Sequence, residues 1–238
     1  MLDKFDHVFV LNAASIASLQ QFTSAPISHL ASAADCMMAR PAPGASNRNI
    51  DVYSFGRRSA AIHEQLLDMA EQNPDFLYVY DTIRGGKVGN WREHRMLTAA
   101  MMKNSKYFIA FNPSDVGGGA TGSFCGEHAL STRYFEGIAG GAVMLGTEPN
   151  CPEYSSNFDW PDALIKLDPD GDIATLLEDL NGQQGRVETA SKRNVSQAMQ
   201  RHDWSHRWLS ILNCLGLPAS FELTERIELL SSLSKLLF

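Results

Sequence analysis

The sequence of 238 residues contains no run of about 18 apolar residues, so it predicts no transmembrane helix. It also lacks a cluster of lysines and arginines, and 20 basic residues against 27 acidic ones give a net charge of −7. Such a chain is a poor candidate for nucleic-acid binding. The first residues, MLDKFDHVFVLN, lack the basic and long apolar regions of a signal peptide. We expect a cytoplasmic protein whose contact with a membrane, if any, is peripheral.

Cysteine is scarce as well. The four cysteines, at positions 36, 125, 151 and 214, stand far apart and form no CxxC pair, so we expect reduced thiols and no zinc site. GxSxG and HExxH motifs are absent, as is a pair of carboxylates in a catalytic pattern. These absences argue against the serine hydrolases and zinc proteases that carry such motifs. No metal or cofactor is expected.

The composition is that of a globular protein, with 44% hydrophobic and 20% charged residues. At roughly 150 residues per domain, the length predicts about one and a half domains. The segment from Arg40 to Asn49, RPAPGASNRN, is dense in proline, glycine, serine and asparagine, which predicts a linker or a long loop. It separates a short first part of the chain from a longer second part.

The two parts differ in their pattern. The first part predicts a buried strand from Phe5 to Leu11, a helix from Ala13 to Phe22 and an extended piece from Ile27 to Leu30. In the second part, short apolar strands alternate with helices. The predicted strands are Asp51–Phe55, Phe76–Tyr80, Tyr107–Phe111 and Ala142–Leu145, with Leu164–Leu167 as a fifth candidate. The predicted helices span residues 59–70, 91–104, 132–139, 173–180, 186–201, 204–215 and 223–237.

This alternation predicts the fold class. Strands that are apolar throughout are typical of a sheet covered on both faces, and strands that alternate with helices are typical of right-handed βαβ crossovers. We therefore expect an α/β protein with a Rossmann-like, doubly wound parallel sheet. Ligands of such folds bind beyond the carboxyl ends of the strands, at the point where the strand order reverses. The loops after Phe55, Tyr80, Phe111 and Leu145 are therefore the places to look for a site.

Two loops carry candidate binding residues. Gly56, Arg57 and Arg58 follow a strand and precede a helix. Two guanidinium groups there suit a phosphate. A glycine turn followed by two solvated arginines is the alternative interpretation of this segment. The second loop, NPSDVGGGATGSFCG from Asn112 to Gly126, is rich in glycine but has neither a GxGxxG fingerprint nor the GK[ST] ending of a P-loop. It is equally compatible with a binding loop and with a surface loop.

The third candidate is the stretch STRYFEGIAGGAVMLG, from Ser131 to Gly146. Ser131 or Thr132 begins a helix, and Glu136 lies about one turn further along it. A buried carboxylate at that place can accept two hydrogen bonds from the hydroxyls of a ribose. Alternatively, Glu136 forms an ordinary surface ion pair with Arg133 at i,i+3 spacing.

Several segments together resemble a known family. RYFEGIAGGAVMLG resembles the segment R-x-F-E-x-(small)-A-x-G-(small)-V of GT-B glycosyltransferases, in particular the glycosyl transferases group 1 superfamily. SFGRR resembles the first strand and basic residue of the C-terminal domain in that family, and PISHLASAAD the crossover that enters this domain. RHDWSHRWLSIL resembles the H-x-W-x-x-R that begins a late helix. The resemblance extends from about Phe5 to Leu217.

The resemblance implies a site for the donor, a nucleotide-diphosphate sugar. Glu136 matches the glutamate that binds the ribose, and Arg57 or Arg58 matches the basic residue on the diphosphate. Ser131 and Thr132 match the helix start that faces the phosphates. Phe111, Asn112 and Pro113 match the loop beside the base. Leaving-group stabilisation by arginine and a helix dipole needs no metal ion, so no DxD-type metal site is expected.

The sequence departs from the family in two respects. Many relatives carry a second glutamate eight residues before the ribose-binding one, where this chain has His128, a weak candidate for a catalytic residue. GT-B enzymes also have an N-terminal domain that supplies the acceptor site and the usual base. This chain resembles only the end of that domain, so the expected division is residues 1–39 as an incomplete N-terminal strand–helix piece and crossover, 40–218 as the nucleotide-sugar-binding domain, and 219–238 as a C-terminal amphipathic helix.

Other features have plainer interpretations. His202 and His206 stand at i,i+4, but Asp203 is a predicted N-cap, which places His202 outside the helix and argues against a metal site. We expect Trp204, Trp208 and Leu212 in the core, together with three methionines, Met96, Met101 and Met102. The apolar stripe of the last helix is expected to face a dimer mate, another partner or the N-terminal piece. Membrane docking is disfavoured because glutamates dominate its polar face.

Three hypotheses follow. The first is a metal-independent glycosyltransferase, or its donor-binding part, which transfers a sugar to an unknown glycan, protein or lipid acceptor. The second is a non-catalytic nucleotide-sugar-binding subunit that acts with a separate N-terminal-domain partner or as a homo-oligomer. The third is another Rossmann-like protein, such as a sugar-nucleotide epimerase.

Overall fold

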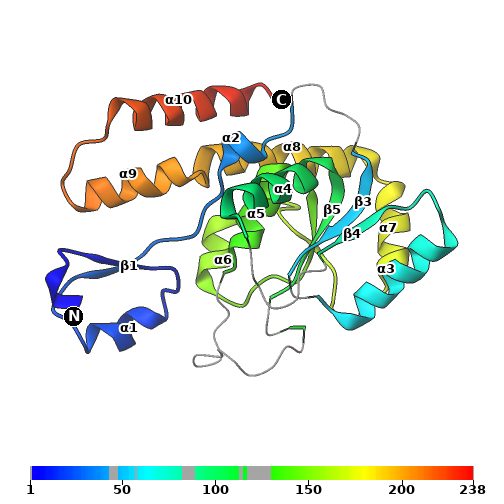
Figure 1. Cartoon of the computed structure of the whole chain (residues 1–238), viewed down its shortest axis with the longest axis horizontal. Coiled ribbons are helices and arrows are strands. Elements are labelled where there is room, and N and C mark those ends of the chain that lie inside the picture. Colours follow the sequence, from blue (N-terminus) through cyan, green and yellow to red (C-terminus); the bar gives the residue numbers. More distant parts are fainter. Residues whose placement is uncertain are drawn as a thin grey trace.

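The computed structural model describes residues 2–42, 48–56, 58–81, 89–112, 115–116 and 130–237. Its main feature is a parallel sheet of five strands in the order β4-β3-β5-β6-β7 (Figure 1). The strands are β3 (Ile50–Ser54), β4 (Tyr78–Tyr80), β5 (Ser105–Ala110), β6 (Val143–Gly146) and β7 (Ile165–Lys166). The expected doubly wound α/β fold is confirmed, and the strand order reverses between β3 and β5.

Helices cover both faces of this sheet. One core forms against α3 (Ala60–Gln72) and α7 (Ile173–Asn181). The other forms against α2 (Cys36–Ala39), α4 (Trp91–Asn104), α5 (Thr132–Gly140) and α8 (Gln184–Arg201). All four residues of β6 are buried, as a strand covered on both faces requires. Two short helices that the sequence did not predict are α2 and α6 (Pro152–Asn157).

Local capping explains where several helices begin. The Ser59 hydroxyl accepts a hydrogen bond from the N–H of Ile62 at the start of α3, and the Asn90 side chain accepts from Arg92 and Glu93 at the start of α4. Each bond satisfies a donor that the first turn of a helix leaves without an intrahelical partner. Both N-terminal boundaries are therefore set by the sequence next to them.

The N-terminal residues form a small unit of their own. It contains a 3-10 turn (Leu2–Lys4), β1 (Val8–Val10), α1 (Ser15–Gln20) and β2 (Ile27–His29), and β1 and β2 pair in parallel. All three residues of β1 are only partly buried, so the expectation of a fully buried strand is wrong. The reason is that a sheet of two strands is too small to bury the side chains on either of its faces.

The chain ends in two helices, α9 (Trp204–Cys214) and α10 (Phe221–Lys235), and α10 lies along α8 (Figure 1). Leu230 of α10 is fully buried in the core beside α8, so part of the apolar stripe faces this domain and not a partner. Trp208 and Met96 were expected in the core but are 57% and 53% exposed, because nothing in the described residues covers those helix faces. Within the described ranges, no helix is both long and apolar enough to cross a membrane.

Candidate functional site

The candidate site lies at the carboxyl edge of the sheet, where β3 and β5 are neighbours. Gly56 follows β3 in a left-handed conformation with φ of 74°, and its N–H donates to Oδ2 of Asp81 at 3.0 Å. A side chain is disfavoured here because L-residues avoid this conformation, and a Cβ would lie 2.8 Å from the guanidinium of Arg133, which would have to shift. The loop after β3 is therefore in close contact with the first turn of α5.

Arg133 is a cation at this edge whose importance the sequence did not reveal. Its guanidinium carbon lies 5.7 Å from the ring centre of Phe55, in cation–π geometry. From the sequence, Arg133 was only a neighbour of Glu136 on the same helix. The signal that could have found it is its place at the second residue of α5, since a helix N-terminus attracts anions.

The predicted start of α5 is confirmed: Ser131 is the N-cap, and its side chain makes no capping hydrogen bond. The hydroxyl of Thr132 is 2.9 Å from that of Ser32, a residue of the segment between β2 and α2. The side chain of Ser131 thus leaves the backbone N–H groups of the first turn of α5 without a cap from the N-cap residue. These groups, together with the helix dipole, form a favourable place for an anion.

Arg58, one of the two arginines after β3, forms an ion pair with Asp81 at the end of β4. Its guanidinium also donates to the backbone carbonyl of Asp81 at 3.0 Å and lies 5.3 Å from the ring centre of Tyr80. The charge of Arg58 is thus largely neutralised by Asp81. Arg57 lies outside the described residues.

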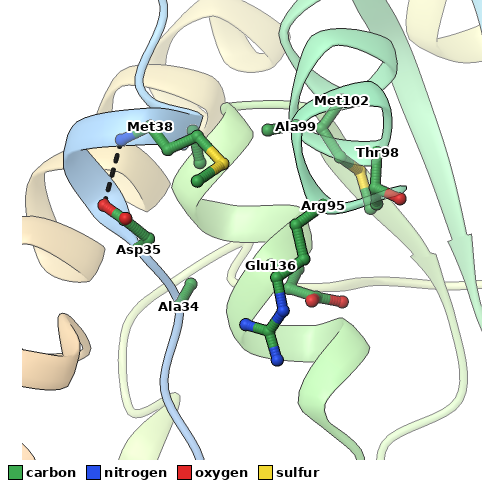
Figure 2. A pocket seen from close by; sticks show the side chains of 9 residues that line it. Ala34, Asp35, Met38, Arg95, Thr98, Ala99, Met102 and Glu136 are labelled. Atoms are coloured by element: carbon green, nitrogen blue, oxygen red, sulfur yellow. Dashed lines mark hydrogen bonds between the residues drawn. The ribbon is translucent and has the colours of Figure 1, made fainter. Parts of the chain in front are cut away.

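Glu136 lines a small cavity between α2, α4 and α5, with a volume of about 40 Å³ (Figure 2). Asp35 and Arg95 line the same cavity, and Figure 2 shows Arg95 beside Glu136. Burial raises the pKa of Glu136, and the positive charges of Arg95 and Arg133 oppose this shift. The carboxylate is therefore costly to keep ionised without a ligand.

Two further predicted residues are buried in the fold. Phe111 and Asn112 are 1% and 3% exposed, and the Phe111 side chain belongs to the core beside α3 and α7. Pro113 and His128 lie outside the described residues, as does most of the glycine-rich loop. The expected place of His202 is confirmed, because it follows α8 and precedes the N-cap Asp203 of α9.

The two histidines near α9, His202 and His206, form hydrogen bonds to different backbone carbonyls. Nε2 of His202 is 2.8 Å from the carbonyl oxygen of Asn157, and Nε2 of His206 is 2.9 Å from that of Met199. Burial lowers the pKa of His202 to about 3, so this ring is neutral. In the described part of the chain, no three histidine, cysteine or acidic side chains gather as they would around a metal ion.

No protein-family model matches the sequence, and no curated protein matches it significantly. Solved structures do resemble it. HepE of Anabaena, solved with UDP and glucose, aligns with a TM-score of 0.56 at 12% identity over 90% of this chain and 64% of HepE. Sucrose-phosphate synthase of Thermosynechococcus elongatus aligns with a TM-score of 0.54 at 10% identity, over 90% of this chain and 58% of the synthase.

A chain of the GtfA/B complex aligns with a TM-score of 0.51 at 14% identity, over 95% of this chain and 46% of that one. These neighbours confirm the fold that the resemblance implied, that of the GT-B glycosyltransferases. The chain spans between 46% and 64% of the length of the three proteins it resembles. At such identities the likeness establishes the fold, and the activity has to be argued from the site.

Proposed function

We propose that the chain binds a nucleotide-diphosphate sugar at the carboxyl edge of the sheet and forms the donor-binding part of a metal-independent glycosyltransferase. One observation carries the proposal. The loop at Gly56 and the guanidinium of Arg133 are in contact at the start of α5, where the strand order reverses, and Glu136 follows one turn further along the same helix. The fold is shared with HepE, which has been solved with UDP and with UDP-glucose.

The order of the groups along α5 fits a nucleoside diphosphate. The first turn offers backbone N–H groups and Arg133 to the phosphates, and Glu136 follows one turn later, about 6 Å along the helix axis at 1.5 Å per residue. An ionised carboxylate there accepts hydrogen bonds from the two hydroxyls of a ribose. A nucleotide with its diphosphate at the helix start and its ribose at Glu136 therefore satisfies both groups.

The same arrangement supports sugar transfer. When the bond between the sugar and the diphosphate breaks, negative charge develops on the departing phosphate oxygens. The dipole of α5 and the guanidinium of Arg133 are fixed where this charge appears, so they stabilise it without reorganisation. In this mechanism no metal ion is needed, and binding of the diphosphate should survive an excess of EDTA.

A second function keeps the same binding site without the chemistry. The aligned part corresponds to 46% to 64% of the neighbouring chains, which includes the proposed donor side of the cleft. The alternative is a non-catalytic subunit that binds the nucleotide sugar and acts with a partner. Slow hydrolysis of a donor sugar by this chain alone favours the enzyme, and binding without hydrolysis favours the subunit.

Calorimetric titration with UDP, GDP and ADP tests the shared part of both functions. We expect one of them to bind and Glu136→Ala to weaken that binding by about 1–3 kcal/mol, because the ribose hydroxyls lose their acceptor. Glu64→Ala, which removes an exposed carboxylate of α3, is the matched control and should bind as the wild type does. Absence of binding for all three nucleotides at millimolar concentration would refute the proposal.

A further inference from the structure

Arg207 of α9 makes an unusual number of contacts for a side chain that is distant in sequence from the site. Its Nε donates to the carbonyl oxygen of Ala31 at 2.9 Å, and its Nη2 donates to that of Ser32, also at 2.9 Å. Nη1 donates to the carbonyl of Arg201 at 2.9 Å. The guanidinium carbon also lies 5.9 Å from the ring centre of Phe135, which belongs to α5. Arg207 thus joins α9, the segment before α2 and α5.

Ser32 completes the connection to the candidate site. Its hydroxyl is 2.9 Å from that of Thr132, the first residue of α5, although the two residues are 100 positions apart. Ser32 is 5% exposed and Thr132 is half-buried, so the hydrogen bond is partly shielded from water. Arg207 holds the backbone of Ser32, and Ser32 holds the first turn of α5.

The segment that carries Ser32 is fixed on its other side as well. The N–H of Ala34 donates to the carbonyl of His202 at 2.9 Å, and the N–H of Trp204 donates to the carbonyl of Ala34 at 3.2 Å. The N–H of Cys36 donates to Oδ2 of Asp203 at 2.9 Å. Because these bonds fix the register of residues 31–36 against α9, Ser32 cannot move away from Thr132 without breaking several of them.

We propose that Arg207 and Ser32 are positioning residues for the diphosphate end of the donor site, a role that rests on the proposed function. The N–H groups of a helix start bind phosphate well only when they are held in one position. In the described residues, Ser32 supplies the side-chain hydrogen bond to the Thr132 hydroxyl, and Arg207 keeps Ser32 in place. Neither residue lines the small cavity beside Glu136.

Comparing a nucleoside diphosphate with its nucleoside separates positioning from a general structural role. UDP, GDP and ADP are titrated by calorimetry, and the nucleoside of the base that binds is then measured by competition. We expect Ser32→Ala to weaken the diphosphate by about three- to tenfold, the range for loss of one hydrogen bond. The affinity for the nucleoside should stay unchanged. Arg207→Met should have a larger effect in the same direction, and Arg207→Lys, which keeps the charge, an intermediate one.

Ser210→Ala is the control, since its hydroxyl donates to the carbonyl of His206 on the exposed side of α9. It should leave both affinities unchanged. If Ser32→Ala leaves the diphosphate affinity unchanged, or weakens the nucleoside by the same factor, the positioning role is wrong while the proposed function stands. If the wild type binds none of the three diphosphates, the proposed function fails and this role fails with it. Should Arg207→Met prevent folding, the Ser32→Ala comparison still decides.

Discussion

Replacing Asp203 with asparagine should destabilise the protein strongly. The side chain of Asp203 is 0% exposed and accepts four hydrogen bonds. The N–H groups of Cys36 and Ser205 donate at 2.9 Å each, and Nε and Nη2 of Arg226 donate at 2.8 and 2.7 Å. One carboxylate therefore joins the segment before α2, the start of α9 and the last helix, α10.

The magnitude follows from these contacts. Breaking a buried ion pair by removing one charge costs about 3–5 kcal/mol. The side chain of Arg226 is 35% exposed, so solvent screens its loss, and the lower end of that range applies. Asparagine remains a good N-cap, so the capping of α9 contributes little. We expect a loss of about 3 kcal/mol, a large part of the 5–15 kcal/mol that stabilises a typical protein.

The effect should depend on pH in a defined direction. Burial by itself raises the pKa of Asp203, but the hydrogen bonds from Arg226, Ser205 and Cys36 outweigh it, and the net pKa is lowered. A carboxyl with a lowered pKa in the folded state stabilises the protein fully above its unfolded pKa of about 3.9 and loses this contribution as pH falls through the folded value. The difference between wild type and Asp203→Asn should therefore be constant near neutral pH and shrink below about pH 4.

Urea denaturation at pH 7, pH 4 and pH 3 measures both quantities. Asp162→Asn is the matched control, because Asp162 also forms a bidentate pair, with Arg186, but at the surface. Surface pairs contribute about 0–1 kcal/mol. A loss for Asp203→Asn no larger than that of the control at pH 7, or a difference that stays constant down to pH 3, would refute the reasoning.

Three further predictions concern single side chains. Arg48→Met should cost about 3 kcal/mol in urea denaturation, because the half-buried guanidinium donates to three backbone carbonyls, including that of Gly140 at the end of α5, each bond to a charged group contributing about 1.5–3 kcal/mol at most; a loss below about 1 kcal/mol would contradict this. Gly56→Ala should lower stability by about 1–2 kcal/mol through its left-handed conformation, while the flexible Arg133 side chain moves away from the new Cβ; an unchanged melting temperature would contradict it. Glu136→Gln should raise the melting temperature at pH 7, since burial raises the pKa of Glu136 and disfavours its ionised form in the folded state. This gain should vanish below about pH 4, and a gain that persists there would contradict the assignment.

The order of strands and helices was readable from the sequence because it depends on neighbouring residues. Apolar runs such as YFIAF became β5, and the caps at Ser59 and Asn90 fixed the starts of α3 and α4. Both partners of a capping hydrogen bond lie within about three residues of each other, so the local sequence contains all the information that predicts it. The fifth strand, β7, is confirmed at Ile165–Lys166 within the expected span.

The sequence did not predict which faces of the helices and strands are covered by neighbouring elements. Trp208 stands at a spacing typical of a buried helix face, yet it is exposed because no described element packs on that side of α9. The apolar run at Phe5 to Leu11 reads like a central strand, but β1 has only β2 beside it and stays half-exposed. Hydrophobic periodicity gives the direction of a face and not the presence of a neighbour.

The candidate site also has one part that the sequence predicted and one part that depends on tertiary contacts. Ser131 and Glu136 lie on one helix, so their relative placement follows from its geometry. The sequence does not distinguish the environments of Arg58 and Arg133, and only the tertiary structure shows their different contacts. Arg58 meets Asp81, which is 23 positions away, whereas Arg133 reaches the loop at Gly56.

Net charge and local charge lead to different conclusions about ligands. The chain carries −7 overall, which argues against long polyanions. Locally, however, the positive charges of Arg95 and Arg133 both lower the pKa of Glu136 against the effect of burial. A cationic spot within an acidic surface selects for an anion that is small enough to touch only that spot. A nucleoside diphosphate meets this requirement and a nucleic acid does not, so the proposed site is compatible with the acidic net charge of the chain.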